Sequence, residues 1–98
     1  MCMISVIMTV FNVEQYIEKA IKSILEQEYV DLELIIVDDC SEDKSIEIAK
    51  SFNDSRIKFV KNDINMGAGY SRKVGIEHAT GDYIITIDAD DWIEPQFL

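Results

Sequence analysis

The segment Asp88-Ala89-Asp90-Asp91 has the residue types and the spacing that most directly suggest chemistry in this chain. Its three carboxylates directly follow an apolar, β-branched run at residues 83–87, which is typical of a parallel strand buried on both faces. Carboxylate oxygens are the ligands that Mg²⁺ and Mn²⁺ prefer, and substrate phosphates commonly complete the coordination of these ions. The segment therefore predicts a divalent metal site, with a solvated acidic turn as the alternative.

Other polar residues stand at the ends of other apolar runs. The residues that follow the predicted strands are Thr9, Phe11 and Asn12, then Asp38 and Asp39, then Asn62, and finally Asp88 to Asp91. Parallel strands bring their carboxyl ends to one edge of a sheet, which is where open α/β sheets bind ligands. We therefore expect these residues to meet at a single site.

The elements that would position these residues alternate between strand and helix along the whole chain, with no linker, repeat or low-complexity segment. The patterns predict strands at residues 3–10, 32–37, 57–60 and 83–87, the third lying nearer an edge of the sheet. Strands joined by helical crossovers lie parallel to one another. The predicted fold class is therefore α/β, a three-layer α/β/α Rossmann-like, mostly parallel sheet in a single domain of residues 1–98.

Three helices are predicted between these strands. Asn12, with Gln15 three residues later, predicts a capping box for the first helix, whose apolar face includes Ile17, Ala20, Ile21 and Ile24. Ser41 is the predicted cap of the second helix, which would turn Ile48, Ala49 and Phe52 inward. The third helix opens at residues 65–69 and runs to about Ala79, with a face of small residues suited to close packing on the sheet. Pro95 predicts the start of a further helix.

Composition excludes several classes of protein. The net charge is −10, from 19 acidic and 9 basic residues, so the surface repels nucleic acid, whose binding depends on Lys and Arg. No apolar run approaches the roughly 20 residues of a membrane span, and the first residues lack the basic start of a signal peptide. Cys2 and Cys40 have no metal-binding spacing. We expect a cytoplasmic chain without a membrane span.

Five motifs in order resemble the nucleotide-sugar-binding half of the family 2 glycosyltransferases, the inverting group with the GT-A fold. They are Ser5-Val6-Ile7-Met8-Thr9-Val10-Phe11-Asn12, Glu33-Leu34-Ile35-Ile36-Val37-Asp38-Asp39, Asn65-Met66-Gly67 followed by Arg72, Gly81-Asp82-Tyr83-Ile84, and Asp88-Ala89-Asp90-Asp91-Trp92. The resemblance covers essentially the whole chain. It differs at Cys40, where members of the family commonly have Gly or another small residue.

The resemblance implies roles for the nucleotide-binding residues. Thr9 and the Phe11 backbone would lie against the nucleotide. Asp39 would accept a hydrogen bond from the base, most often uracil, whose imide N–H suits a carboxylate, and Asp38 is assigned second. Arg72 matches the arginine that lies near the nucleotide, and a guanidinium is a planar, multi-donor cation suited to phosphates and base carbonyls.

The resemblance also implies the metal site and the reaction. Asp88 would lie near the ribose and the metal, Asp90 would be the metal ligand, and Asp91 would support it, with Mn²⁺ or Mg²⁺ as cofactor. A sugar would pass, with inversion, from a nucleoside diphosphate sugar (a UDP-sugar above all) to a hydroxyl of a carbohydrate or lipid-linked acceptor, as in polysaccharide and cell-envelope biosynthesis. The parent enzyme would work in the cytoplasm, or peripherally at the inner face of the membrane.

We expect the chain to be the donor half of a longer enzyme, truncated before the acceptor half. The general base would lie beyond Leu98, so that no catalytic residue is assigned and the 98 residues alone would be inactive. The alternative is a non-catalytic nucleotide-binding module or pseudo-enzyme fragment. A receiver domain would need a Lys after a late strand, and a nucleotidyltransferase would need a Gly-rich basic loop after the first strand. The sequence has neither feature.

Overall fold

The computed structural model describes residues 3–28 and 31–88, and at Asp88 it describes the backbone alone. Its elements, in chain order, are β1 (Ile4–Val10), α1 (Ile17–Leu25), β2 (Leu32–Asp38), α2 (Ser45–Lys50), β3 (Ile57–Lys61), α3 (Ala68–His78) and β4 (Tyr83–Asp88). All pairs of neighbouring strands among these are parallel, and their order in the sheet is β3-β2-β1-β4. The predicted alternation, the parallel sheet and the edge position of the third strand are confirmed.

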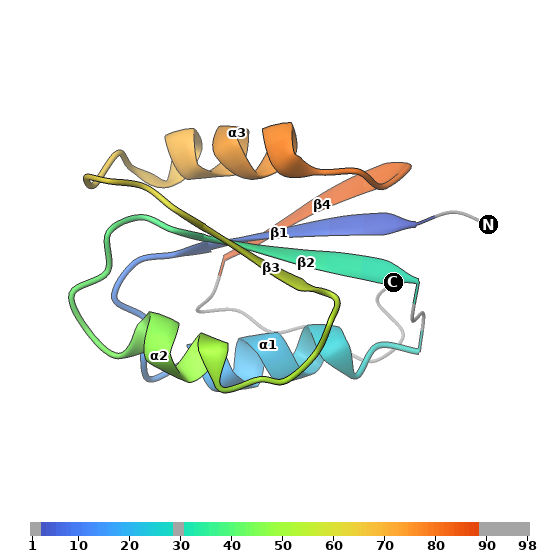
Figure 1. Ribbon diagram of the computed structural model, residues 1–98, viewed down its shortest axis with the longest axis horizontal. Helices are drawn as coiled ribbons and strands as arrows, with labels where there is room; N and C mark the ends of the chain where they lie inside the picture. Colours follow the sequence, from blue (N-terminus) through green and yellow to red (C-terminus); the bar gives the residue numbers. More distant parts are fainter. Residues whose placement is uncertain (1–2, 29–30, 89–98) are drawn as a thin grey trace.

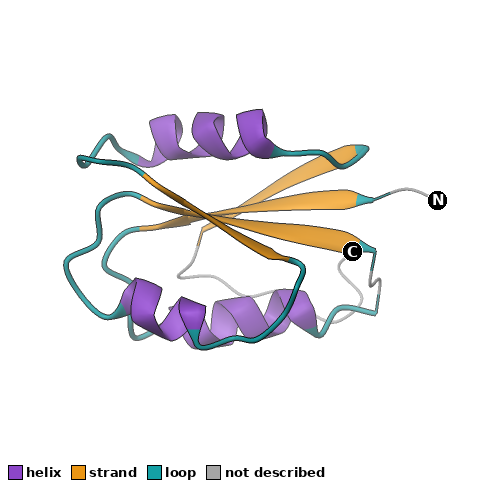
Figure 2. Ribbon diagram, in the orientation of Figure 1, coloured by secondary structure: helices purple, strands orange, loops and turns teal. Residues whose placement is uncertain are grey.

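The elements form three layers. Helix α3 covers one face of the sheet, and α1 and α2 cover the other (Figure 1). The same layers are seen when the chain is coloured by secondary structure (Figure 2). The loops that follow β1, β2 and β3 gather beyond the carboxyl ends of these strands, at the left of Figure 1. The predicted α/β/α architecture is therefore confirmed, and the polar strand ends do share one edge.

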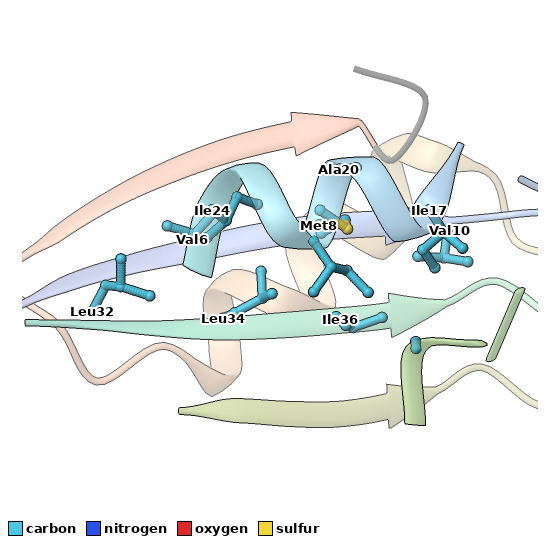
Figure 3. Close-up of a cluster of buried hydrophobic side chains, with 11 residues drawn as sticks. Val6, Met8, Val10, Ile17, Ala20, Ile24, Leu32, Leu34 and Ile36 are labelled. Carbon is cyan, nitrogen blue, oxygen red and sulfur yellow. The ribbon is translucent and has the colours of Figure 1, made fainter. Parts of the chain in front are cut away.

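The larger core lies between the sheet and the helices α1 and α2. Helix α1 buries Ile17, Ala20, Ile21 and Ile24, the face that its spacing predicts. Alternate residues of the two central strands meet this face because side chains of a strand alternate between the two sides of a sheet. They are Val6, Met8 and Val10 of β1 and Leu32, Leu34 and Ile36 of β2 (Figure 3). Each fully buried aliphatic side chain contributes roughly 1.5–3 kcal/mol.

The smaller core lies under α3 and depends on small residues. Ser71 and Gly75 of α3 are buried, and the helix packs on the face of the sheet that carries Ile7, Ile35 and Val37. A Cβ atom at Gly75 would collide with Cγ2 of Ile7 and would come within 3.2 Å of Cγ2 of Val37. The absence of a side chain at Gly75 therefore sets how closely α3 approaches the sheet.

We predict that Gly75→Ala lowers the free energy of unfolding by about 1–3 kcal/mol, the usual cost of overpacking a core. Gly69→Ala is the matched control in the same helix, because a Cβ atom there meets nothing within 4 Å. The control is expected to be neutral or to stabilise the chain by up to about 1 kcal/mol. Urea denaturation of the three chains measures the difference, and equal stability of the two variants would contradict the packing role of Gly75.

Two predicted helix starts are wrong. Helix α1 begins at Ile17 and α2 at Ser45, and neither has a side-chain cap. Asn12, which has a positive φ of 50°, instead accepts a hydrogen bond from the Glu42 N–H, while its own N–H donates to Ser41 Oγ at 3.1 Å. The polar side chains that were predicted to cap their own helices thus tie the β1–α1 loop to the β2–α2 loop.

The prediction that the 83–87 strand is buried on both faces is also wrong for the described part of the chain. Tyr83 is 61% exposed and Ile84 is 45% exposed. The reason is position: β4 is the last strand of the described sheet and pairs only with β1, whereas α3 packs on β1 and β2. β4 therefore carries more apolar side chains than the described neighbouring elements cover.

An ionic cluster around the buried Glu33 closes the opposite end of the sheet from the carboxyl edge, with its partner Lys58 half exposed. Glu33 is 4% exposed and accepts hydrogen bonds from Ser5 Oγ at 2.5 Å, Lys58 Nζ at 2.5 Å and the Thr80 N–H at 2.7 Å. Ser5 Oγ in turn accepts from the Gly81 N–H at 2.8 Å. The cluster fixes the connection between α3 and β4 against the first residues of β1 and β2.

Candidate functional site: a cavity at the carboxyl edge of the sheet

A cavity of about 230 Å³ opens on the α3 side of the sheet, beyond the ends of β1 and β2. It is lined by Thr9, Val10, Phe11, Asp39, Asn65, Gly67, Ala68 and Ser71. The sequence predictions placed Thr9, Phe11 and Asp39 together, and the structure brings these three side by side in one cavity. Since drug-sized ligands occupy about 300–1,000 Å³, this cavity has room for part of such a ligand, for example a heterocyclic base.

Among the described residues, Asp39 is the only charged one that lines this cavity, and its carboxylate is held by three hydrogen bonds. Oδ1 accepts from the Met66 N–H at 2.7 Å and from Asn62 Nδ2 at 3.0 Å, and Oδ2 accepts from the Gly67 N–H at 2.8 Å. Burial raises the pKa of the Asp39 carboxyl, but these three hydrogen bonds outweigh it and hold the pKa below its usual value. Asp39 is therefore an ionised acceptor at neutral pH.

The loop before α3 needs a glycine to reach this carboxylate. Gly67 has a φ of +91°, a backbone conformation that residues other than glycine rarely adopt, and it directly precedes the first turn of α3. The left-handed backbone directs its N–H to Asp39, so the loop between β3 and α3 forms one wall of the cavity.

Asp38 lies elsewhere. Its carboxylate is on the α2 side of the sheet, where Oδ1 accepts from the Ser41 N–H at 2.9 Å. Asp38 lines a second cavity of about 180 Å³, together with residues of α2 and β3 that include Lys50 and Phe59. The structure therefore does not bring the predicted nucleotide contacts Asp38 and Asp39 together, because consecutive residues at the end of a strand face opposite sides of the sheet.

The remaining predicted site residues are placed only in part. Arg72 follows the cavity residue Ser71 on α3, is half-buried, and is not among the lining residues. Asp88 is the last residue of β4, and its backbone pairs in register with Thr9, so this strand end lies beside the cavity. Asp90 and Asp91 lie outside the described residues, as does Trp92. Within residues 3–28 and 31–88, no three acidic, His or Cys side chains gather as metal ligands would.

Two residues of the site have roles that sequence reasoning missed. Asn62 is 7% exposed and donates from Nδ2 both to Asp39 and to Ser71 Oγ, the latter at 3.0 Å. Ser71 is fully buried and lines the cavity. Asn62 was predicted only as a strand-end residue, and Ser71 lies on the buried face of α3, which was predicted to carry small residues. The hydroxyl of Ser71, on a helix face otherwise made of Ala and Gly, was the signal in the sequence for a hydrogen-bonded role.

Comparison with known proteins supplies the family. The model of glycosyl transferase family 2 matches residues 5–98. A glycosyltransferase of Haemophilus influenzae is 45% identical over 95% of this chain and 38% of its own length. Across the first curated relatives that it matches, the chain spans between 14% and 38% of their lengths.

Two solved structures have the same fold. Staphylococcus aureus TarS, solved as residues 1–349 with UDP, is 31% identical, with a TM-score of 0.90 over 95% of this chain and 29% of its own. The mannosyltransferase PcManGT from Pyrobaculum calidifontis, solved with GDP-Man and Mn²⁺, is 27% identical, with a TM-score of 0.83 over 91% of this chain and 28% of its own. The family match, the close relative and the shared fold agree: this chain belongs to glycosyl transferase family 2.

Proposed function

We propose that this chain forms the donor-binding part of a glycosyltransferase that moves a sugar, with inversion, from a UDP-sugar to an acceptor hydroxyl. In this proposal the cavity beyond β1 and β2 takes the base. Thr9, the Phe11 backbone and Asp39 contact the nucleoside, and Arg72 and Asp88 lie near its ribose and phosphates. Asp38, whose carboxylate lines the other cavity, is not included in this contact set.

The observation that carries the proposal is the state of the Asp39 carboxylate. A carboxylate can accept about four hydrogen bonds, and three are taken by protein donors. The remaining acceptor position, on Oδ2, suits a ligand that presents an N–H group, as the imide of uracil does. The complexes of TarS with UDP and with UDP-GlcNAc support the choice of a uridine nucleotide.

A divalent ion fits the chemistry of the acidic segment at the end of β4. The register places Asp88 beside Thr9, so the carboxylates of Asp90 and Asp91 follow directly on a strand end that borders the cavity. When bound, Mn²⁺ or Mg²⁺ would neutralise the charge that develops on the departing diphosphate. The Mn²⁺ complex of PcManGT supports this use of a divalent ion. In the proposal, Asp90 is the principal ligand and Asp88 and Asp91 assist it.

The proposal places the acceptor site and the general base outside the described residues. Inversion needs a base within hydrogen-bond reach of the acceptor hydroxyl, and no carboxylate or His of the described cavity other than the engaged Asp39 could serve. The acceptor is proposed to be a carbohydrate or a lipid-linked sugar. The described residues contain no helix that is both long enough and apolar enough to cross a bilayer.

Calorimetric titration of the chain with UDP, with and without Mn²⁺, tests this function. We expect Mn²⁺ to increase UDP affinity at least about tenfold, because the ion pairs with the diphosphate, and we expect Asp90→Ala to remove that increase. Uridine, which has no phosphate, is the control ligand and should bind equally with and without Mn²⁺. UDP binding that is identical with and without the ion in both chains would contradict the metal site.

The second candidate function is a nucleotide-binding module without catalysis. It predicts the same titrations, so the two are separated by an assay of the longer enzyme that the first proposal implies. Release of UDP from a UDP-sugar, dependent on an added acceptor and lost in Asp90→Ala, supports the transferase. Tight UDP binding by that longer protein, with no turnover of any UDP-sugar, would support the module.

A further inference from the structure

The hydrogen bonds around Asp39 are divided unequally between its two oxygens. Among the described residues, Oδ1 has two donors, the Met66 N–H and Asn62 Nδ2, whereas Oδ2 has only the Gly67 N–H. Each oxygen of a carboxylate has two acceptor positions. Oδ1 is therefore saturated from within the protein, and Oδ2 keeps one position for a ligand.

Asn62 determines this division. Its backbone N–H donates to the Asp38 carbonyl at 2.9 Å, and its Nδ2 donates to Asp39 Oδ1 and to Ser71 Oγ, both at 3.0 Å. Because a carboxylate only accepts hydrogen bonds, the atom of Asn62 that faces Asp39 must be the amide nitrogen, and both of its hydrogens are used. Asn62 is 7% exposed and Ser71 is fully buried, so water does not replace these bonds easily.

We propose that Asn62 is a positioning residue for base recognition, which saturates Asp39 Oδ1 and leaves Oδ2 as the one oxygen of this carboxylate that can accept from a base. This inference rests on the function proposed above. A single acceptor matches a base with one isolated N–H between two carbonyls, as in uracil. It does not match the pair of adjacent N–H groups of guanine, which needs both carboxylate oxygens. Cytosine would place a bare ring nitrogen against the carboxylate.

The isosteric variant Asn62→Asp tests the positioning role. It keeps the shape of the side chain but places a second carboxylate against Asp39. At pH 8, where both are ionised, they repel one another, and we expect UDP affinity to fall at least about tenfold. At pH 5 the pair shares a proton, the protonated carboxyl again donates to Asp39, and we expect most of the affinity to return.

Among the described residues, few charged groups lie close enough to position 62 to change how a carboxyl there would titrate. Its side chain contacts Asp39 from the end of β2 and Ser71 from α3, and Asp39 is the titratable member of that pair. The hydrogen bond between Asp38 and residue 62 involves only the backbone carbonyl of Asp38. Lys61 and Asp63, the chain neighbours of residue 62, are exposed. Asn53→Asp, on an exposed asparagine, is the control and should keep the pH profile of the unmodified chain.

Base selectivity gives a second readout, which a role limited to stability would not change. We expect the unmodified chain to bind UDP at least about tenfold more tightly than GDP or CDP, since the other two bases leave a buried polar group without a partner. In Asn62→Ala the Met66 and Gly67 N–H groups still hold the carboxylate, but Oδ1 regains an acceptor position that the amino group of cytosine can use. The preference for UDP over CDP should therefore narrow together with the loss of affinity. Thermal melts at pH 5 and pH 8 establish that each variant is folded.

The outcomes separate the two proposals. Failure of the unmodified chain to bind any of the three nucleotides would overturn the proposed function and this inference with it. UDP binding by the unmodified chain, with the same affinity at pH 8 and the same base preference in Asn62→Asp, would overturn only the role of Asn62. If Asn62→Asp does not fold, an unchanged preference for UDP over CDP in Asn62→Ala overturns that role.

Discussion

Asp39→Asn is expected to reduce UDP affinity at least about 100-fold, since hydrogen bonds to a charged group contribute about 1.5–3 kcal/mol each and several change together. The new amide is uncharged, and its NH₂ group cannot accept. Either the Met66 N–H or the Gly67 N–H would therefore face another donor. The change removes the proposed acceptor for the base and weakens the hydrogen bonds that hold the wall of the cavity. Calorimetry with UDP measures the loss.

Asp38→Asn is the matched comparison for this result. The two aspartates are adjacent and both buried, but the Asp38 carboxylate lines the cavity on the α2 side and accepts from the Ser41 N–H. We expect Asp38→Asn to change UDP affinity less than about threefold, which corresponds to less than roughly 0.7 kcal/mol. An equal loss in the two variants would show that the position of the carboxylate on the sheet does not decide its role.

Glu33→Gln is expected to lower stability at pH 7 by roughly 3 kcal/mol. Burial of Glu33 raises the pKa of its carboxyl, but hydrogen bonds from Lys58, Ser5 and Thr80 outweigh it and lower the pKa from 4.5 to about 2. A shift of this size corresponds to roughly 3 kcal/mol at about 1.4 kcal/mol per pKa unit. Since the folded-state pKa is the lower one, this stability is present above the pKa of the unfolded chain and is lost as pH falls from about 4.5 toward 2.

Urea denaturation of both chains between pH 7 and pH 3 measures this effect. Because the hydrogen-bonded carboxyls of Asp39, Asp43 and Asp54 also have lowered pKa values, the unmodified chain loses stability in acid for several reasons. The informative quantity is the difference between the unmodified chain and Glu33→Gln, which should shrink as pH falls. Glu77→Gln, on the exposed face of α3, should show no such pH-dependent difference. A difference for Glu33→Gln that stays constant with pH would contradict the ionic origin of the stability.

Apolar periodicity predicted the framework of this fold because burial of regular apolar faces dominates its stability. The buried face of α1 and the alternating residues of β1 and β2 were both readable from spacing. Helix starts were not, because Asn12 and Ser41 satisfy polar groups of another loop, about 30 residues away in the chain, instead of their own helices. A capping pattern is a local signal, and tertiary hydrogen bonds overrode it.

The sequence also predicted some of the residues that line the candidate cavity. Strand ends pointed to Thr9, Phe11 and Asp39, since topology alone brings such residues to one edge. The contribution of Asn62 depends on the exact direction of an amide between a carboxylate and a hydroxyl, which no sequence pattern encodes. Cys40 is an intermediate case: its φ of +63° is a backbone conformation that favours Gly, one of the residues that the resemblance led us to expect at this position.

The opposed directions of Asp38 and Asp39 have a consequence for how related proteins are compared. A shift of one column in a sequence alignment would still match an aspartate with an aspartate, yet it would move the proposed nucleotide contact from one face of the sheet to the other. Side chains alternate along β2, and Ile35 and Val37 face α3, so counting on by two from Val37 identifies Asp39 as the aspartate on the α3 side. Engineering of base preference in such enzymes should begin from this count.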